Sequence, residues 1–176
     1  MIALSKGHVM RSLDQSLPLM LLRAREAAME HFRPHLQAHG VTEQQWRVLR
    51  ALAEIGPVEA GPLARRVCLL MPSLSRILRD LAQSGLLKRS RKDGDGRSVI
   101  VSLTARGRVL FARMSEESEL IYATLEKAVG AKRFEALKAE LESLIVCLNA
   151  VPVHQPQKPD ARSEAVASRE HPIVSI

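Results

Sequence analysis

Residues 63–103 read LARRVCLLMPSLSRILRDLAQSGLLKRSRKDGDGRSVIVSL, and this stretch decides the fold. Its apolar residues at 74, 77, 78 and 81 have the i, i+3, i+4, i+7 spacing of an amphipathic helix. Pro72 lies in the first turn of that helix and Gly85 just beyond its end, where these residue types are favoured. Alternating apolar residues around a turn with Gly94 and Gly96 are typical of a two-stranded ribbon. The stretch therefore predicts a short helix, a second helix over 72–84 and a β-hairpin.

The helix over 72–84 presents a polar, basic face opposite its apolar stripe. At 100° per residue Arg76 and Arg79 fall opposite the stripe, and two serines flank it near the N-terminal end. Two helices followed by a basic hairpin are typical of a winged helix, whose second helix enters the major groove of DNA. The alternative is an amphipathic helix with a solvated face. The candidate DNA-contacting residues of this helix are Pro72, Ser73, Ser75, Arg76 and Arg79.

The positive charge of the chain is concentrated around the hairpin. The net charge is +7 with a pI of about 10.0, and residues 71–107 hold eight basic residues against three acidic ones. A focal basic patch beside two glycines predicts a wing that contacts phosphates or a narrow minor groove. The alternative is a solvated, charged β-turn. Asp95 lies two residues before Arg97, close enough to orient its guanidinium, and the predicted wing contacts are Arg91, Lys92, Asp95 and Arg97.

Helical patterns also flank this stretch. One begins at Ser16 with Pro18 in its first turn, and Pro34 is expected to kink or end it because the proline ring clashes with the carbonyl four residues back. Thr42 and Gln45 then have capping-box spacing, which predicts the start of the next helix. Long amphipathic helices follow the hairpin, and their apolar stripes exceed what a small winged helix can cover. We therefore expect a homodimer.

The expected fold is mainly α with a small β-hairpin, a winged helix-turn-helix with long N- and C-terminal dimerisation helices. We expect a flexible basic arm over 1–15, a helical dimerisation region formed by 16–40 and 104–149, and a winged helix-turn-helix domain over 41–103. The segment 150–176 has scattered prolines and no periodic pattern, which predicts a disordered tail.

Several strings in this sequence resemble the MarR family of bacterial regulators over about residues 16–149. They are Leu63-Ala64, the serine-rich helix, Gly85-Leu86-Leu87, Asp95-Gly96-Arg97 and the segment Val101–Gly107. Within the family, the segments Ala24–Met29, Phe32–Pro34 and Thr42–Arg47 are similar to the subgroup of homoprotocatechuate-operon repressors.

The resemblance implies a homodimeric winged helix-turn-helix repressor of a pseudo-palindromic operator, with Asp95 and Arg97 at the wing tip and Arg97 in the minor groove. Gly96 replaces an arginine that many relatives carry, so wing affinity is expected to depend more on Arg97, Lys92 and Arg91.

The resemblance also implies a small aromatic acid as effector, because relatives bind such acids between the dimerisation helices and the winged domain. A hydroxyphenylacetate, hydroxybenzoate or hydroxynicotinate is expected, in the control of an aromatic catabolic operon. The candidate ligand residues are Arg25 for the carboxylate, Met29 and Trp46 for apolar walls, and Arg11 as a lid. The alternatives are that Trp46 belongs to the core and that Arg25 pairs with neighbouring acids or is solvated.

Enzymatic and metal-binding functions find little support in the sequence. No nucleophile elbow, phosphate loop or hydrolase signature occurs, so no enzyme and no cofactor is expected. His31, His35 and His39 lie four residues apart, but Pro34 interrupts their helix and no nearby Cys or carboxylate completes a set, so no metal site is predicted.

Cysteine usage and hydropathy suggest a reducing cytoplasm and no membrane segment. The two cysteines are far apart, and the apolar run at 17–22 is too short to span a bilayer. Cys68 follows an apolar residue and is expected to be a buried thiol, with redox sensing as an alternative function. Two further alternatives are an architectural DNA-binding protein without sequence preference and a helical module that binds an acidic protein.

Overall fold

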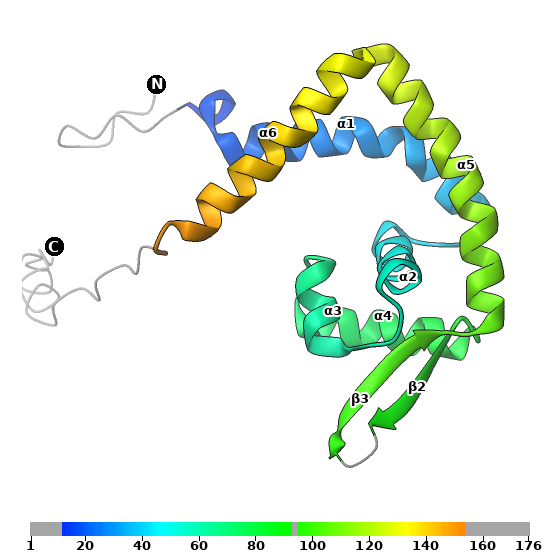
Figure 1. The fold of residues 1–176 in the computed structure, drawn as a ribbon. Helices are drawn as coiled ribbons and strands as arrows, with labels where there is room; N and C mark the ends of the chain where they lie inside the picture. Colours follow the sequence, from blue (N-terminus) through cyan, green and yellow to red (C-terminus); the bar gives the residue numbers. More distant parts are fainter. Residues whose placement is uncertain (1–11, 93–94, 154–176) are drawn as a thin grey trace, which may run out of the picture. The chain divides into compact units, whose positions relative to one another are not determined.

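The computed structural model describes the backbone of residues 12–92 and 95–153 and the side chains of those residues outside 91–98. The chain divides into two compact units, Met1–Gly130 and Ala131–Ile176, which are described separately below. The elements of the first unit are η1 (Leu13–Gln15), α1 (Leu17–Ala38), α2 (Glu43–Ile55), β1 (Val58–Glu59), α3 (Ala60–Arg66), α4 (Met71–Gln83), β2 (Leu87–Lys92), β3 (Asp95–Leu103) and α5 (Ala105–Val129) (Figure 1). The second unit contains α6 (Ala131–Ala150).

The predicted helix starts and stops are largely confirmed. Thr42 caps α2 in a capping box: the backbone N–H of Gln45 donates to Thr42 Oγ1 over 3.1 Å, and Thr42 N–H donates to Gln45 Oε1 over 3.0 Å. Gly85 follows the end of α4 with a φ of +69°, a left-handed conformation that glycine adopts without strain. Local chemistry therefore determines where these two helices begin and end.

The hairpin is part of a three-stranded antiparallel sheet with the order β1-β3-β2. The sequence predicted β2 and β3 as a hairpin, and Leu87 pairs with Leu103 at its base. The short strand β1 was not predicted; Val58 pairs with Val101. Two residues are too few to show an alternating pattern, so only the tertiary fold reveals this strand. It anchors the inner half of β3 to the helical body.

The core of the first unit is formed where α2, α3, α4 and the sheet meet. The apolar stripe predicted for α4 is confirmed, because Leu74, Ile77, Leu78 and Leu81 are all buried. They pack in one cluster with residues of α2, α3, β3 and α5, among them Leu49, Leu63, Val101 and Met114. The opposite face of α4 is thereby directed to solvent.

The start of α5 is locked to the turn that follows α4. Thr104 Oγ1 donates to the carbonyl of Gly85 over 2.7 Å and accepts from the N–H of Gly107 over 3.0 Å. Gly107 is buried so closely that a Cβ there would lie 2.2 Å from the carbonyl oxygen of Leu86. Glycine is required at this position, and the contact ties the long helix to the end of α4.

Of the two outcomes expected at Pro34, a kink or an end, the end does not occur, because α1 continues through Pro34 to Ala38, within the helical region expected over 16–40. Proline removes one backbone donor, but Phe32, His35 and Leu36 around it are buried. Tertiary packing on both sides of the proline outweighs the local penalty. The helix instead ends before Gly40, which has a φ of +63°.

In the second unit α6 has no buried residue among those that the structure describes. The apolar side chains of Leu137, Ile145, Val146 and Leu148 are exposed by half or more. On α1, Leu17, Met20, Leu21 and Leu22 are likewise exposed. Both helices thus carry apolar surface that the described part of the chain leaves uncovered.

Of the predicted arm, residues 13–15 form η1, and residues 1–11 lie outside the described part of the chain. The predicted tail also lies outside it from residue 154 onward. None of the helices in the described part is sufficiently long and apolar to cross a membrane.

Candidate nucleic-acid interface and ligand pocket

The outer face of α4 offers polar and basic groups on a rigid helix. Arg76, Arg79 and Ser75 are exposed, Pro72 is exposed in the first turn, and Ser73 is partly buried. Neither arginine has a carboxylate partner among the described residues. Both guanidiniums are therefore available to base edges or phosphates.

The N-terminal end of α4 is open. Its N-cap residue is Leu70, whose side chain cannot accept a hydrogen bond from the first turn. The first backbone N–H groups of a helix lack intrahelical partners and favour anions. Leu70 is 78% exposed, so this end of α4 is accessible to a phosphate.

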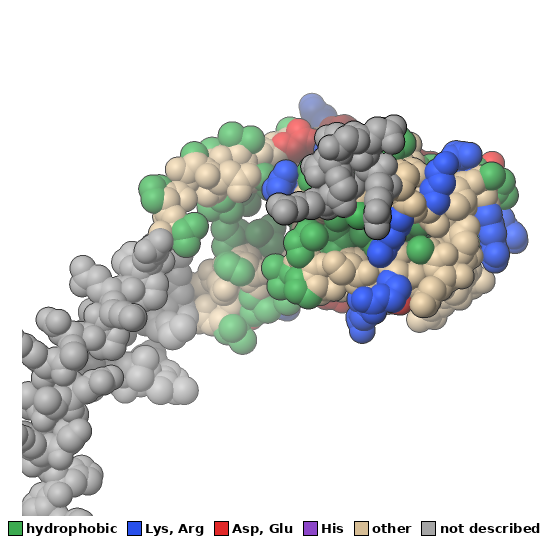
Figure 2. Space-filling view, turned by 90° about the horizontal axis from the view of Figure 1, so that it is seen from below, with side chains coloured by type: hydrophobic (Ala, Val, Ile, Leu, Met, Phe, Trp, Pro, Cys, Tyr) green, Lys and Arg blue, Asp and Glu red, His purple; other side chains and the backbone are tan. Residues whose placement is uncertain are grey.

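The wing lies beside this helix and adds further positive charge. Lys88 and Arg89 on β2 are exposed, and the register shifts between Arg91 and Lys92, near the tip. The side chains of the predicted wing residues Arg91, Lys92, Asp95 and Arg97 lie outside the described residues. Seen from the hairpin side, Lys and Arg side chains are spread over this face, with fewer acidic side chains among them (Figure 2).

A cavity of about 280 Å³ lies between α1, α2 and α5. Its apolar walls are formed by Met29, Phe32 and Trp46, and Tyr122 completes the aromatic lining. Trp46 is 8% exposed and stacks on Phe111, with ring centroids 5.5 Å apart. The remaining lining residues are Arg25, Glu43, Arg47 and Arg50. The volume is close to the lower end of the usual range for ligand sites, roughly 300–1,000 Å³, and suits a molecule with one ring.

Arg50 is the cation best placed to bind an anion in this cavity. Its guanidinium donates to Tyr122 Oη over 2.9 Å and lies 5.5 Å from the centroid of that ring. No carboxylate of the described residues pairs with it. In contrast, Arg47 donates to the carbonyl of Val67 over 2.9 Å. Arg50 and Tyr122 thus form a donor pair with unused hydrogen-bonding capacity.

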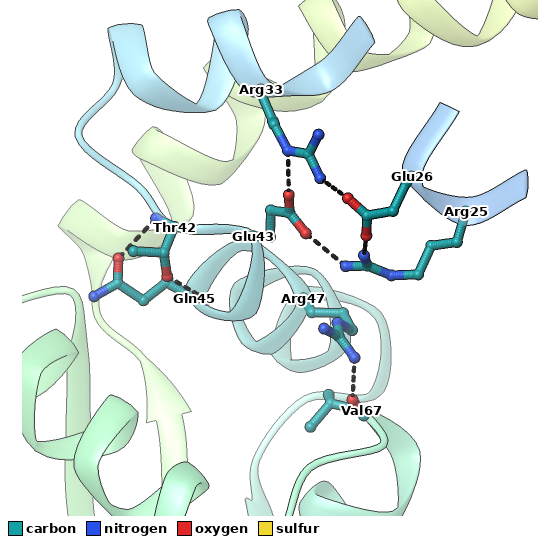
Figure 3. A network of polar contacts seen from close by, with 8 residues as sticks. All are labelled: Arg25, Glu26, Arg33, Thr42, Glu43, Gln45, Arg47 and Val67. Carbon is teal, nitrogen blue, oxygen red and sulfur yellow. Dashed lines mark hydrogen bonds and ion pairs between the residues drawn. The ribbon is translucent and has the colours of Figure 1, made fainter. Parts of the chain in front are cut away.

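A network of charges closes another part of the cavity wall (Figure 3). Arg25 donates to Glu26 and to Glu43, and Arg33 donates to the same two carboxylates. The network joins α1 to the first turn of α2. Burial raises the pKa of the Glu43 carboxyl, but hydrogen bonds from Arg33 and Arg25 outweigh that effect and hold the pKa below its ordinary value. Hydrogen bonds to Glu26 and Glu43 raise the pKa of Arg33.

The low pKa of Glu43 makes the stability of this network dependent on pH. A carboxyl whose pKa is lowered on folding contributes its stability above the unfolded pKa, here 4.5, and loses it as the pH falls through the folded pKa. We expect Glu43→Gln to lower the Tm at pH 7, and the difference from the wild type to shrink below pH 4.5. Thermal unfolding between pH 7 and 3 measures this, with Glu30→Gln, an exposed acid on α1, as the matched control. A difference that stays constant over this range would contradict the role of the ionised carboxylate.

The structure brings together three of the four residues predicted for ligand binding. Arg25, Met29 and Trp46 line the cavity, and Arg11 lies outside the described residues. Trp46 is both a core residue and a cavity wall, so the two interpretations of it hold together. Of the two alternatives for Arg25, the structure shows the pairing with neighbouring acids, because its guanidinium forms ion pairs with Glu26 and Glu43.

Sequence reasoning missed Phe32, Glu43, Arg47, Arg50 and Tyr122. The spacing of Arg50 four residues after Trp46 places both on one side of α2 and could have indicated the arginine. No local signal indicates Tyr122, which comes from α5, 72 positions further along the chain than Arg50.

The prediction that Cys68 is buried was wrong, because the residue is exposed. It lies directly after α3 with a φ of +51°, so the chain turns here and the side chain leaves the apolar face that ends at Val67. Cys147 is exposed as well.

Comparisons with known proteins show which family this chain resembles. A model of the MarR family matches residues 41–99. The chain is 39% identical over 138 residues to the homoprotocatechuate degradative operon repressor of Escherichia coli, covering 78% of this chain and 93% of the relative. It is 38% identical over 143 residues to the HTH-type transcriptional regulator FarR of Neisseria gonorrhoeae, covering 80% and 98%.

Among solved structures, NadR in complex with 4-hydroxyphenylacetate is similar with a TM-score of 0.71 at 36% identity, covering 78% of this chain and 100% of NadR. The fold, the exposed basic residues of α4 and β2, and these relatives all indicate the same family. The chain belongs to the MarR family, whose members are transcriptional regulators that bind DNA.

Proposed function

We propose that this protein is a homodimeric repressor that binds a pseudo-palindromic operator and is released from it by a hydroxylated aromatic acid such as 4-hydroxyphenylacetate. The two copies of α4 would enter successive major grooves roughly 34 Å apart, with the wings over the flanking minor grooves. The genes under its control would belong to an aromatic catabolic operon. Because its partner is chromosomal DNA, we expect it in the cytoplasm.

Dimerisation is supported by the apolar surface that α1 and α6 leave uncovered. Leu17, Met20 and Leu22 on α1 and Leu137 and Ile145 on α6 are exposed large apolar side chains. Apolar stripes of this kind on long helices are normally buried against another helix. A second copy of the chain would supply the matching surface and would set the spacing of the two α4 helices.

The observation that carries the effector proposal is the Arg50–Tyr122 donor pair in an aromatic-walled cavity. Arg50 has no carboxylate partner among the described residues, so a ligand carboxylate can accept from its remaining N–H groups and from Tyr122 Oη. Phe32 and Trp46 supply apolar walls for a ring. Glu43, also in the lining, supplies an acceptor for a ring hydroxyl. The relative NadR is known in complex with 4-hydroxyphenylacetate, which has these three features.

Ligand binding would act on DNA affinity through the elements that form the cavity. Arg25, Met29 and Phe32 come from α1, Trp46 and Arg50 from α2, and Tyr122 from α5. A ligand that contacts all three helices favours one angle between α1 and α5 and the winged domain. The ligand releases DNA to the extent that it binds more tightly to the conformation with wrongly spaced α4 helices than to the conformation that binds the operator.

A combined binding and melting experiment tests the proposal. Operator duplex selected from a random pool by the protein itself is titrated by fluorescence anisotropy, with and without 4-hydroxyphenylacetate, phenylacetate or 4-hydroxyphenylacetamide. We expect 4-hydroxyphenylacetate to weaken operator binding and to raise the Tm of the free protein. At 100 times its Kd the ligand should increase the free energy of unfolding by about 2.7 kcal/mol. The acid without the hydroxyl and the amide without the charge should do less.

Two results would contradict the proposal. Equal affinity for operator and random duplex would indicate an architectural DNA-binding protein, since specific binding typically exceeds non-specific binding by about 10³-fold or more. If none of the aromatic acids changed operator binding, the proposed effector would be wrong, whereas the proposed repressor function would still stand.

A further inference from the structure

A cluster of potential metal ligands lies outside the cavity described above, at the contact between α1 and α5. His35 lies in the last turn of α1, His39 is the C-cap residue directly after this helix, and Glu117 comes from α5. One ligand atom from each residue lies within 4.8 Å of the others. His35 Nδ1 is 2.6 Å from Glu117 Oε2, and the His35 and His39 rings are 5.0 Å apart.

The hydrogen bonds of His39 leave one ring nitrogen with a free lone pair. His39 Nδ1 is 3.1 Å from the carbonyl oxygen of His35, and because a carbonyl can only accept, Nδ1 carries the proton. In the neutral ring Nε2 is then an acceptor. This atom is buried and has no hydrogen-bond partner within the described part of the chain. A histidine whose Nδ1 donates to a backbone carbonyl while Nε2 is free has the arrangement that is usual for a metal ligand.

His35 directs its other ring nitrogen at Glu117. Its Nε2 lies 3.3 Å from Ser118 Oγ, which also lies 2.9 Å from the carbonyl oxygen of Met114. Its Nδ1 lies 2.6 Å from Glu117 Oε2, so a hydrogen-bond proton or a metal ion lies between these two atoms. When a metal ion takes the place of that proton, Nδ1 and the carboxylate both become ligands and the Nε2 proton is donated to the serine.

We propose that His35, His39 and Glu117 bind a divalent transition metal ion, with Zn²⁺ as the best match. The ligands would be His35 Nδ1, His39 Nε2 and one Glu117 oxygen, with water in the fourth position. Two imidazoles and a carboxylate are a common Zn²⁺ set, and histidines at i and i+4 on one helix face can share an ion. Tetrahedral Zn²⁺ with bonds of about 2.0–2.2 Å holds its ligands roughly 3.3 Å apart. His35 Nδ1 and Glu117 Oε2, 2.6 Å apart, would therefore separate slightly, and ligand atoms up to 4.8 Å apart would approach one another.

The burial of the three residues fits a site that an ion can enter. The His35 side chain is 5% exposed, whereas Glu117 is 50% exposed, so the carboxylate can rotate onto an entering ion. Ser118, hydrogen-bonded to the backbone of α5, would hold the His35 ring in its orientation. The ion would link α1 to α5 independently of any aromatic effector, so this inference does not rest on the proposed effector.

Metal titration of the full chain, stripped of metal with a chelator, tests the proposal. Co²⁺ is added while its visible absorption is recorded, and Zn²⁺ affinity is then obtained by competition. We expect one ion per chain, with affinity reduced at least tenfold in His39→Gln and in Glu117→Gln. The matched controls are His31→Gln, an exposed histidine one turn before His35, and Glu116→Gln, the neighbouring exposed acid. Both controls should bind as the wild type does.

Two-bond ¹H–¹⁵N correlation spectra of the histidine rings provide a readout that does not depend on affinity. On Zn²⁺ addition, Nε2 of His39 should shift while its Nδ1 keeps the proton. Circular dichroism confirms that each variant is folded. The proposal is overturned if the wild type shows no saturable binding in the micromolar range, or if neither His39→Gln nor Glu117→Gln weakens it. In either case the cluster is a hydrogen-bonded link between the C-terminal end of α1 and α5.

Discussion

Replacing Arg76 with alanine is expected to weaken binding to the operator by roughly 5- to 150-fold per half-site, the equivalent of about 1–3 kcal/mol. The reason is geometric: Arg76 lies on the solvent face of α4, opposite the buried stripe of Leu74, Ile77, Leu78 and Leu81. A rigid helix directs a long, unpaired guanidinium outward, where it can donate two parallel hydrogen bonds to guanine O6 and N7. In a homodimer both half-sites lose this contact, so the free-energy cost approximately doubles.

The measurement compares operator duplex with random duplex at several salt concentrations. Arg76→Ala should reduce the preference for operator, whereas Lys88→Ala on the wing should weaken binding to both duplexes and lower the salt slope by about 1. Arg97→Ala is expected to weaken operator binding through the loss of a contact in the minor groove that flanks each half-site. Arg113→Ala, an exposed arginine of α5, removes the same charge away from α4 and serves as the control. If Arg76→Ala and Arg113→Ala bound operator equally, α4 would not be the recognition helix.

The second large effect is expected at Arg50. Arg50→Gln should weaken binding of 4-hydroxyphenylacetate about 10- to 150-fold, because hydrogen bonds to charged groups contribute about 1.5–3 kcal/mol. Glutamine keeps a donor and much of the length, so packing around Tyr122 and Trp46 is disturbed little. Tyr122→Phe removes only the hydroxyl that accepts from Arg50 and should cost several-fold, in line with about 1 kcal/mol for a neutral hydrogen bond.

A matched pair of ligands separates the charge interaction from general damage to the cavity. Isothermal titration calorimetry with 4-hydroxyphenylacetate and its neutral amide gives four affinities for the wild type and Arg50→Gln. The wild type should prefer the acid and the variant should have lost that preference. If both proteins discriminated equally, another group would hold the carboxylate. Operator binding without ligand should be unchanged in Arg50→Gln, since Arg50 lies on α2 and not on the outer face of α4.

How far the sequence reaches can be seen from individual elements. The stripe of α4, the capping box of Thr42 and Gln45 and the base of the hairpin were all predicted, because each depends on residues close together in the chain. The sequence left open whether Pro34 ends or only kinks its helix, and packing of Phe32 and Leu36 decided that the helix continues. The exposure of Cys68 was not predicted, because a turn redirects the side chain.

The two clusters show the same division. The sequence placed Arg25, Met29 and Trp46 in a ligand site, yet Arg50 and Tyr122 meet only because α2 and α5 pack together. Likewise the sequence showed no carboxylate near His35 and His39, and only the packing of α5 against the end of α1 places Glu117 beside them. The sequence by itself determined the helices, the hairpin and the concentration of charge that make this a DNA-binding protein, since periodicity, caps and composition act locally. Only the tertiary structure decided which distant side chains share a cavity or could share an ion, because those contacts depend on how buried faces pack.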